Sequence, residues 1–310
     1  MRGERVRRGW WRSLEGGVTS CPNCNATTCA GLTTHDYNRR CSTESFHYAR
    51  CAGCHLIWLQ DPPPDLAVYY PPGYVPGLSP GRMARIAKKE SYQVGHVLRH
   101  VRPGRLIEVG AGAGIFALQA KDAGFDVTAI EQDATSCRTI EDVVGARAVC
   151  SNEPARAISE EAPARAIALW QSLEHLVDPW SLLDAAADNL QGGGVLAIAT
   201  PNPEAFSLKI LGARWPHLDA PRHLWLFPLT LLTQRLRQAG LYLCEAVFED
   251  RGAVAWNNFA WQRALSNLSS SRAWSTASFG TGLLIGTLLR PLELSERCAS
   301  FTAIFRKPEQ

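Results

Sequence analysis

Three glycines at alternate positions, Gly110, Gly112 and Gly114, are spaced as in a turn that binds a ligand against the backbone. They follow a short apolar run at residues 106–109, which predicts a buried parallel strand. Without Cβ atoms the backbone turns sharply and a ligand can lie directly on it. Glu131 ends the next apolar run, where a carboxylate can accept hydrogen bonds from the hydroxyls of an adenosine ribose. We therefore expect a nucleoside site, with a turn of small residues that binds nothing as the alternative.

The glycine spacing also separates two classes of ligand. A dinucleotide-binding G-x-G-x-x-G turn needs its third glycine at position 115, and this chain has Ile115 there. The observed pattern is E-x-G-x-G-x-G, in which Glu108 precedes the turn and Ala111 lies within it. A nicotinamide-dependent dehydrogenase is therefore the least favoured function.

Two CxxC pairs predict a metal site near the N-terminus. Cys21 pairs with Cys24 and Cys51 with Cys54, with 26 residues between the pairs. Each pair can bind one side of a tetrahedral ion, and the second pair completes the four ligands. Because four thiolates leave no position for water, we expect a structural Zn²⁺ in a zinc ribbon. A redox-active CxxC is the alternative.

Alternating strands and helices around the glycine turn predict the fold class. Apolar runs predict strands at residues 106–109, 125–130, 146–150, 166–170, 195–199, 241–248 and 301–305, and helices at 82–101, 115–123, 180–190 and 229–238. We expect the last strand to be antiparallel. The pattern indicates an α/β protein with a doubly wound, mostly parallel, seven-stranded Rossmann-like sheet, an N-terminal zinc ribbon and a helical substrate lobe.

Composition narrows the range of partners. A formal net charge of +3 over 310 residues is too small to indicate binding to nucleic acid or to an anionic membrane. No run reaches the 18 apolar residues of a membrane-spanning helix, and the basic N-terminal arm lacks the apolar stretch of a signal peptide. We expect a soluble, cytoplasmic protein. For the apolar run at residues 282–290 we favour a helix docked on protein, and weak peripheral membrane contact is the alternative.

Four segments together resemble one branch of the class I S-adenosylmethionine (SAM)-dependent methyltransferases. They are the two CxxC pairs, the E-x-G-x-G-x-G turn, L-E-H-L-x-D-P at residues 173–179 and P-R-H-L-x-x-F-x-x-x-x-L at 221–232. The resemblance implies SAM as cofactor. It places the following residues at SAM: Glu108, Gly110, Ala111, Gly112, Gly114, Glu131, Gln132, Asn152 and Gln171. The chain departs from this branch at Ala164-Arg165-Ala166, where an aspartate is usual, and at Gln171, where a residue such as histidine is common.

Transfer of a methyl group to a hydroxyl needs a base, and histidine serves near neutral pH. His175 follows the fourth predicted strand, and His223 lies in the aromatic segment that we expect to close over the substrate. Glu174 is the candidate for orienting a neighbour. Two alternatives stay open: each histidine only bonds to backbone, or Glu174, His175 and His223 together bind a catalytic divalent cation.

These elements suggest five segments along the chain. We expect a basic flexible tail (1–16), a zinc ribbon (17–61), a linker and helix capping the SAM pocket (62–102), the SAM-binding core (103–205) and a substrate lobe with the last strands (206–310). The expected function is methylation of a small molecule such as a natural product, sugar nucleotide or glycan or lipid precursor, with oxygen slightly favoured over carbon or nitrogen. An RNA methyltransferase and a catalytically silent zinc-ribbon scaffold are the alternatives.

Overall fold

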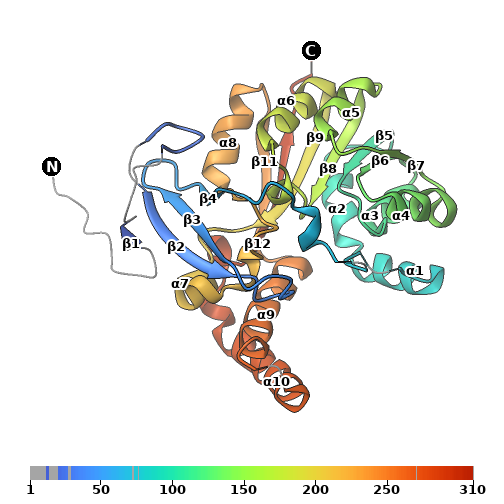
Figure 1. Cartoon of the computed structure of the whole chain (residues 1–310). Helices are drawn as coiled ribbons and strands as arrows, with labels where there is room; N and C mark the ends of the chain where they lie inside the picture. Colours follow the sequence, from blue (N-terminus) through green and yellow to red (C-terminus); the bar gives the residue numbers. More distant parts are fainter. Residues whose placement is uncertain are drawn as a thin grey trace. The chain divides into compact units, whose positions relative to one another are not determined.

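The computed structural model describes residues 12–13, 20–26, 29–71, 73–75, 77–269 and 271–309 (Figure 1). The chain divides into two compact units. Unit 1 comprises Met1–Tyr70, Pro201–Leu231 and Ala253–Ser300, and unit 2 comprises Pro71–Thr200, Leu232–Gly252 and Phe301–Gln310. Apart from residues 12 and 13, the tail expected over residues 1–16 lies outside the described residues. Each unit therefore combines segments that are far apart in the sequence.

Unit 1 contains a five-stranded sheet in the order β1-β2-β3-β4-β10. The strands are β1 (Arg12–Ser13), β2 (Cys29–His35), β3 (Ser45–Cys51), β4 (Ile57–Gln60) and β10 (Trp225–Leu226). Every neighbouring pair is antiparallel. Because Trp225 of β10 lies opposite Trp58 of β4, the aromatic segment after residue 214 belongs to the same sheet as the cysteine module.

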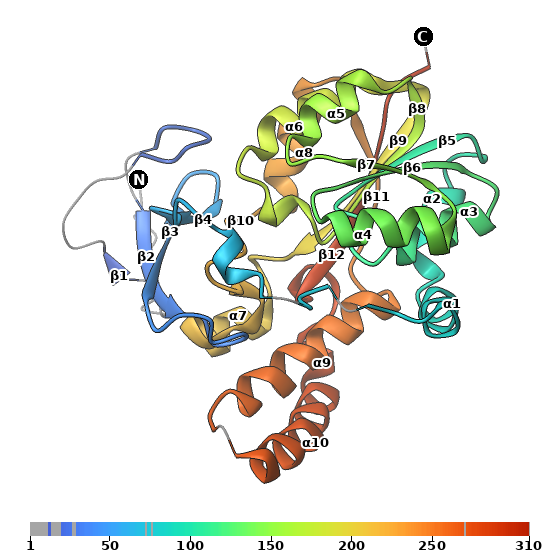
Figure 2. The ribbon, with the colours of Figure 1, turned by 45° about the vertical axis from the view of Figure 1, so that its right-hand side comes forward.

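In unit 1, α7 (Phe206–Leu211) lies beside this sheet and α10 (Arg272–Leu289) lies against α9 (Arg251–Ser266) (Figure 2). The other helical segments described in this unit are the short 3-10 turns Ala67–Tyr69, Gly212–Arg214, Pro216–Leu218, Arg290–Leu292 and Ser295–Arg297. The core of the unit includes the fully buried Tyr48, Trp215 and Leu226. In the part of the chain that the structure describes, no helix is both long enough and apolar enough to cross a bilayer.

Unit 2 is organised by a seven-stranded sheet in the order β11-β12-β9-β8-β5-β6-β7. The strands are β5 (Arg105–Val109), β6 (Asp126–Glu131), β7 (Arg147–Cys150), β8 (Ala164–Trp170), β9 (Leu190–Pro201), β11 (Tyr242–Val247) and β12 (Ser300–Arg306). Four neighbouring pairs from β7 to β9 are parallel, and β11 with β12 is antiparallel. The predicted doubly wound, mostly parallel sheet is confirmed, including its antiparallel last strand.

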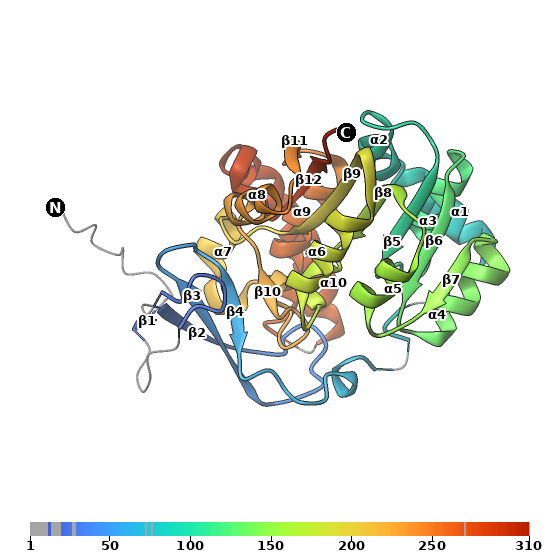
Figure 3. The same ribbon diagram turned by 90° about the horizontal axis from the view of Figure 1, so that it is seen from above.

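Helices cover both faces of this sheet (Figure 3). They are α1 (Pro80–Lys89), α2 (Tyr92–Leu98), α3 (Ile115–Asp122), α4 (Ala134–Thr139), a π-helical turn (Ile140–Val144), α5 (Pro154–Glu160), α6 (Pro179–Asn189) and α8 (Leu229–Gln238). The chain order reverses between β5 and β8. Ligands of open α/β sheets bind beyond the carboxyl ends of the strands at such a switch point.

One predicted element differs from the structure. The single helix expected over residues 82–101 is two helices, because the chain leaves the helical path at Glu90 and Ser91 between α1 and α2. The break lets each helix bury its own apolar side chain in the core, Met83 from α1 and Val97 from α2. An apolar pattern alone does not reveal such a break, since both helices bury residues against the same core.

Candidate functional site

The glycine turn between β5 and α3 has a backbone that side chains rarely adopt. Gly110, Gly112 and Gly114 have φ of +73°, +53° and +75°. A Cβ on Gly110 would lie 2.6 Å from the Cβ of Ser172, and one on Gly114 would lie 3.0 Å from a methyl group of Val144. A Cβ on Gly112 would have no protein atom within 4 Å. At Gly112 it is therefore the conformation, and not the packing of the described chain, that requires glycine.

The carboxylate of Glu131 connects this turn to the end of β6. Its Oε2 accepts the N–H of Gly112 at 2.8 Å. Its Oε1 accepts the N–H groups of Gln132 and Asp133 at 2.8 and 3.0 Å. A carboxylate has about four acceptor positions, so the backbone uses three of them and Oε2 retains one. Glu131, which is buried, thus fixes the turn and can accept one further donor.

Glu108, one residue before the end of β5, is buried in an unfavourable electrostatic environment. Burial, and to a lesser extent the nearby charge of Glu131, raise the pKa of Glu108 well above its usual value. Its Oε2 is buried without a hydrogen-bond partner among the described residues. The Trp170 Nε1 and the Ser172 Oγ share this property and lie at or just after the end of β8, the strand beside β5. Such orphaned polar atoms indicate groups that a bound ligand satisfies.

The segment directly after β8 contains a non-glycine residue with a left-handed backbone conformation. Gln171 has φ +52°, uncommon for a residue with a side chain, and its N–H donates to the carbonyl of Ala199 at 2.8 Å. Glu174 is fully buried and accepts the hydroxyl of Thr200 at 3.0 Å. His175 is half-buried and ends the 3-10 turn Leu173–His175. All three residues belong to unit 2.

Two other predicted SAM contacts are exposed. Gln132 follows β6, and its N–H bonds to Glu131. Asn152 follows β7, one residue after Ser151, whose N–H donates to the carbonyl of Glu131 at 2.9 Å. Strand order thus places Gln132 and Asn152 at the carboxyl ends of neighbouring strands, on the same edge of the sheet as the glycine turn.

His223 belongs to unit 1 and is held by its backbone surroundings. Its Nδ1–H donates to the carbonyl of His217 at 2.8 Å, and the Tyr48 hydroxyl donates to the carbonyl of His223 at 2.7 Å. The first bond leaves the lone pair of the neutral ring on Nε2. Burial lowers the pKa of His223, so the ring favours its neutral form. The alternative of a cation shared by Glu174, His175 and His223 combines residues of both units and stays a prediction.

The residue before His223 forms an ion network that sequence reasoning missed. The guanidinium of Arg222 is fully buried and donates to Asp219 at 2.9 and 3.0 Å and to Asp36 at 2.6 and 3.3 Å. It also donates to the carbonyl of Tyr69 at 3.2 Å. The network ties the loop that carries His223 to the cysteine module. Its only local signal is the spacing of Asp219 and Arg222, since Asp36 lies far away in the sequence.

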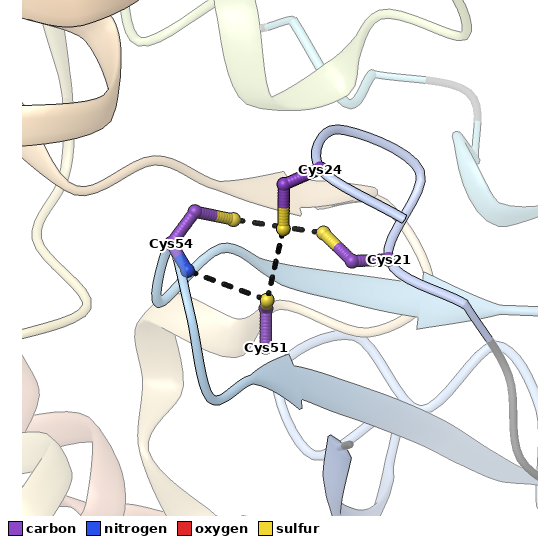
Figure 4. Close-up of side chains that lie close together, drawn as sticks. All are labelled: Cys21, Cys24, Cys51 and Cys54. Carbon is purple, nitrogen blue, oxygen red and sulfur yellow. Dashed lines mark hydrogen bonds between the residues drawn. The ribbon is translucent and has the colours of Figure 1, made fainter. Parts of the chain in front are cut away.

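The four predicted metal ligands lie together in unit 1 (Figure 4). Their sulfur atoms all lie within 4.8 Å of one another, with 3.5 Å from Cys21 to Cys54 and from Cys24 to Cys51. None of the four forms a disulfide. Zn–S bonds of about 2.3 Å give a tetrahedron with edges of about 3.8 Å, so this donor set fits a zinc ion. The N–H groups of Gly53 and Cys54 point to the Cys51 Sγ at 3.3 and 3.4 Å, as expected around a thiolate.

Comparison with known proteins identifies the family. Residues 83–246, more than half of the chain, match the family model described as a methyltransferase domain. The chain belongs to the methyltransferase family. It is 30% identical over 216 residues to a ubiquinone biosynthesis O-methyltransferase of Ruegeria pomeroyi, a match that covers 65% of this chain and 84% of the relative.

Two further similarities agree with this methyltransferase assignment. A protein with the same name from Cereibacter sphaeroides is 33% identical over 112 residues, which cover 34% of this chain and 43% of that protein. A crystal structure of a SAM-dependent methyltransferase from Archaeoglobus fulgidus has a TM-score of 0.50 at 15% identity and covers 78% of this chain and 100% of that one. The structural likeness concerns the fold.

The chain is therefore a SAM-dependent methyltransferase, and the site in unit 2 fits that cofactor. The open backbone at Gly112, the acceptor position left on Glu131 and the orphaned polar atoms all lie at one edge of the sheet. Ser172 and Trp170 were not among the residues predicted to contact SAM, although the turn after the fourth strand was expected at this edge. The available signal was their position at or just after the end of β8, the strand that neighbours the glycine strand.

Proposed function

We propose that this methyltransferase transfers the methyl group of SAM to a small-molecule acceptor, most favourably at an oxygen atom. The names of the two curated relatives, both O-methyltransferases of ubiquinone biosynthesis, support this class of reaction. The observation that carries the proposal is the hydrogen bond between the Gly112 N–H and Glu131, because it holds an acidic side chain beside a backbone position where an added Cβ would meet no protein atom within 4 Å.

We call the sheet edge that carries the turn at residues 110–114 and the ends of β6, β7 and β8 the glycine edge. In this proposal its residues bind SAM. The Glu131 Oε2 accepts one ribose hydroxyl, which is one bond fewer than the sequence suggests, because the backbone already occupies Oε1. Glu108 faces the cationic methionine end. The remaining contacts come from Gly110, Ala111, Gly112, Gly114, Gln132, Asn152 and Gln171. When bound, SAM supplies a methyl group that its sulfonium already activates.

Two histidines are candidates for the base. We favour His223, because its Nδ1–H is committed to a carbonyl and its neutral Nε2 can therefore take a proton from an acceptor hydroxyl. His175 is the second candidate, and Glu174, bonded to Thr200, orients its segment. The lowered pKa of His223 means that the base is already deprotonated at neutral pH.

A structural zinc ion completes the proposal. Cys21, Cys24, Cys51 and Cys54 would hold it in the ribbon of unit 1, where a closed set of four thiolates supports the fold and does no chemistry. A cytoplasmic location, a role in secondary metabolism and the module boundaries given above remain predictions.

Methyl transfer can be tested with a panel of phenolic, sugar and lipid-precursor acceptors and SAM labelled in its methyl group. We expect label in a phenolic or other hydroxyl product that mass spectrometry identifies as an ether. For His223→Ala we expect the rate to fall by roughly a hundredfold, the size usual for a general base, with SAM affinity within about twofold of the wild type. An unchanged rate in this variant removes His223 as the base, and label only in RNA would refute the small-molecule proposal.

A further inference from the structure

Helices α9 and α10 form a closely packed antiparallel pair in unit 1, seen side by side in Figures 1 and 2. Three small residues of α10, Ser278, Gly282 and Gly286, recur every four positions and so share one face. A Cβ on Gly282 would lie 2.4 Å from the Cα of Gln262, and one on Gly286 would lie 2.6 Å from the Asn258 side chain. These contacts with α9 fix which face of α10 is covered.

The other faces of α10 expose large apolar side chains. We name Phe279, Leu283, Leu284 and Leu288 the apolar ridge; their exposed fractions are 43, 47, 60 and 69%. Leu292 and Leu294 continue the exposed apolar surface beyond the helix, and Leu268 and Trp274 do so at the turn between α9 and α10. The sequence has no charged residue between Arg272 and Arg290. A contiguous apolar surface of this kind marks an interaction site.

A basic cleft lies at the turn end of the same helix pair. It has a volume of about 290 Å³ and is lined by Asn38, Arg39, Arg40, Arg263, Ser266, Asn267 and Ser269. Arg263 donates to the carbonyl of Asn38, and Arg40 to that of Asn267 at 3.1 Å, so both guanidinium groups are oriented. Burial, and then the charges of Arg39 and Arg40, lower the pKa of Arg263, while Asp219 and Asp36 act in the opposite direction.

The acidic groups near this cleft are already committed. Asp36 and Asp219 both bind the buried Arg222 at 2.6 and 2.9 Å. At the opposite end of α10, Arg290 and Arg297 are exposed. Glu296 is also exposed at that end, so the clear basic region is the cleft, and the helix pair combines an uncharged apolar surface with this cleft.

We infer that the α9–α10 pair docks on an anionic phospholipid bilayer, with the apolar ridge entering the acyl boundary and the arginines of the basic cleft contacting lipid phosphates. An anionic bilayer is the partner that offers hydrocarbon and phosphate in one surface. A second copy of this chain would bring the same arginines and no anion to the cleft. The inference goes beyond the proposed function and does not depend on it.

Flotation of the full chain with vesicles tests this docking. We expect the protein to float with phosphatidylcholine vesicles that contain 30% phosphatidylglycerol, in the order of tenfold more than with phosphatidylcholine alone, and to be released by high salt. The double variant Leu284→Glu with Leu288→Glu should bind at least about tenfold more weakly. Arg39→Gln with Arg40→Gln should weaken binding to the anionic vesicles and remove most of its salt dependence.

Val68→Glu is the matched control, because Val68 is 62% exposed in the same unit and lies outside the ridge. We expect it to float like the wild type, and unchanged far-UV circular dichroism of all variants confirms that they fold. The inference is overturned if the wild type does not float, or if the leucine variant floats as well as the wild type. It is also overturned if sedimentation shows a wild-type dimer that the leucine variant converts to monomer.

Discussion

Two carboxylates at the glycine edge, Glu108 and Glu131, differ in what surrounds them. Three backbone N–H groups stabilise the charge of Glu131, whereas Glu108 is buried with an oxygen that has no partner in the described chain. Their proximity makes a second negative charge costly, which contributes to the raised pKa of Glu108. A cationic ligand would offset that cost, because it favours the ionised form of Glu108.

Binding of SAM should therefore release a proton from Glu108. Because its pKa is raised, Glu108 keeps its proton to a higher pH than an ordinary carboxyl group, and a cation lowers the pKa in the complex, so affinity should increase as the pH rises through that range. Calorimetric titrations in two buffers of different ionisation enthalpy measure the proton release directly. Glu108→Gln should abolish the release and weaken binding by roughly tenfold. Equal proton release by the variant and the wild type would show that Glu108 is not the group involved.

Glu293 gives unit 1 a dependence of stability on pH. It is buried and accepts the Trp261 Nε1–H at 2.9 Å, and burial raises its pKa to about 7. Since the folded pKa exceeds the unfolded one, its contribution to stability is complete below about pH 4.5 and is lost as the pH rises to about 7, by about 3 kcal/mol at most. Glu293→Gln keeps the acceptor for Trp261 and should flatten the unfolding free energy across this window. Urea denaturation from pH 4.5 to 8 measures the unfolding free energy of both proteins. If this free energy changes with pH as much in the variant as in the wild type, the account is contradicted.

The proposed zinc ion should stabilise the cysteine ribbon of unit 1. Removing one cysteine ligand should release the zinc ion and destabilise the fold of the ribbon, because three thiolates no longer complete the tetrahedral site. Cys51→Ser should therefore lose zinc by elemental analysis and unfold at a lower temperature. Cys244→Ser is the control, since Cys244 is an exposed cysteine outside the cluster and should leave the metal content unchanged. One zinc per chain in the Cys51 variant would contradict a four-thiolate site.

The contact between α9 and α10 requires glycine at position 282, whereas position 280 on the same helix tolerates a side chain. Gly282→Val should destabilise the protein by about 1–3 kcal/mol, because its Cβ would lie 2.4 Å from the backbone of Gln262. Gly280→Ala is the matched control, as a Cβ there meets no atom within 4 Å and alanine favours a helix. Chemical denaturation should show a loss for the first variant and no loss for the second. Equal stability of the two would mean that the helices pack differently.

Elements defined by short-range patterns could be predicted from the sequence. Apolar runs gave the strands β5, β6 and β8 within two residues of their bounds, and α8 coincides with the predicted 229–238. The two-residue strand β10 could not be predicted, because it exists only through pairing with β4. For the same reason the Arg222–Asp36 ion pair left no signal, since a buried charge reveals its partner only in three dimensions.

In the whole molecule, pairing between strands that lie far apart in the sequence decides which segments fold into one unit. Each compact unit takes up three separate segments of the chain, and the five consecutive modules suggested by the sequence stay a prediction. Of the candidate site, the glycine turn and the four cysteines could be predicted, because each rests on closely spaced residues. The turn after β8 was expected beside the glycine strand, but only the structure shows that polar atoms of Trp170 and Ser172 are buried there without a partner among the described residues.

The central claim is that the turn at Gly112 and the carboxylate of Glu131 form the SAM site of this methyltransferase. Calorimetric titration with S-adenosylhomocysteine tests it on the wild type, Gly112→Val, Glu131→Ala and the control Gly280→Ala. We predict one site per chain for the wild type and the control, and affinity weaker by roughly a hundredfold or more for Gly112→Val and Glu131→Ala. Wild-type affinity in either of these two variants, with their folding intact by circular dichroism, would contradict the account.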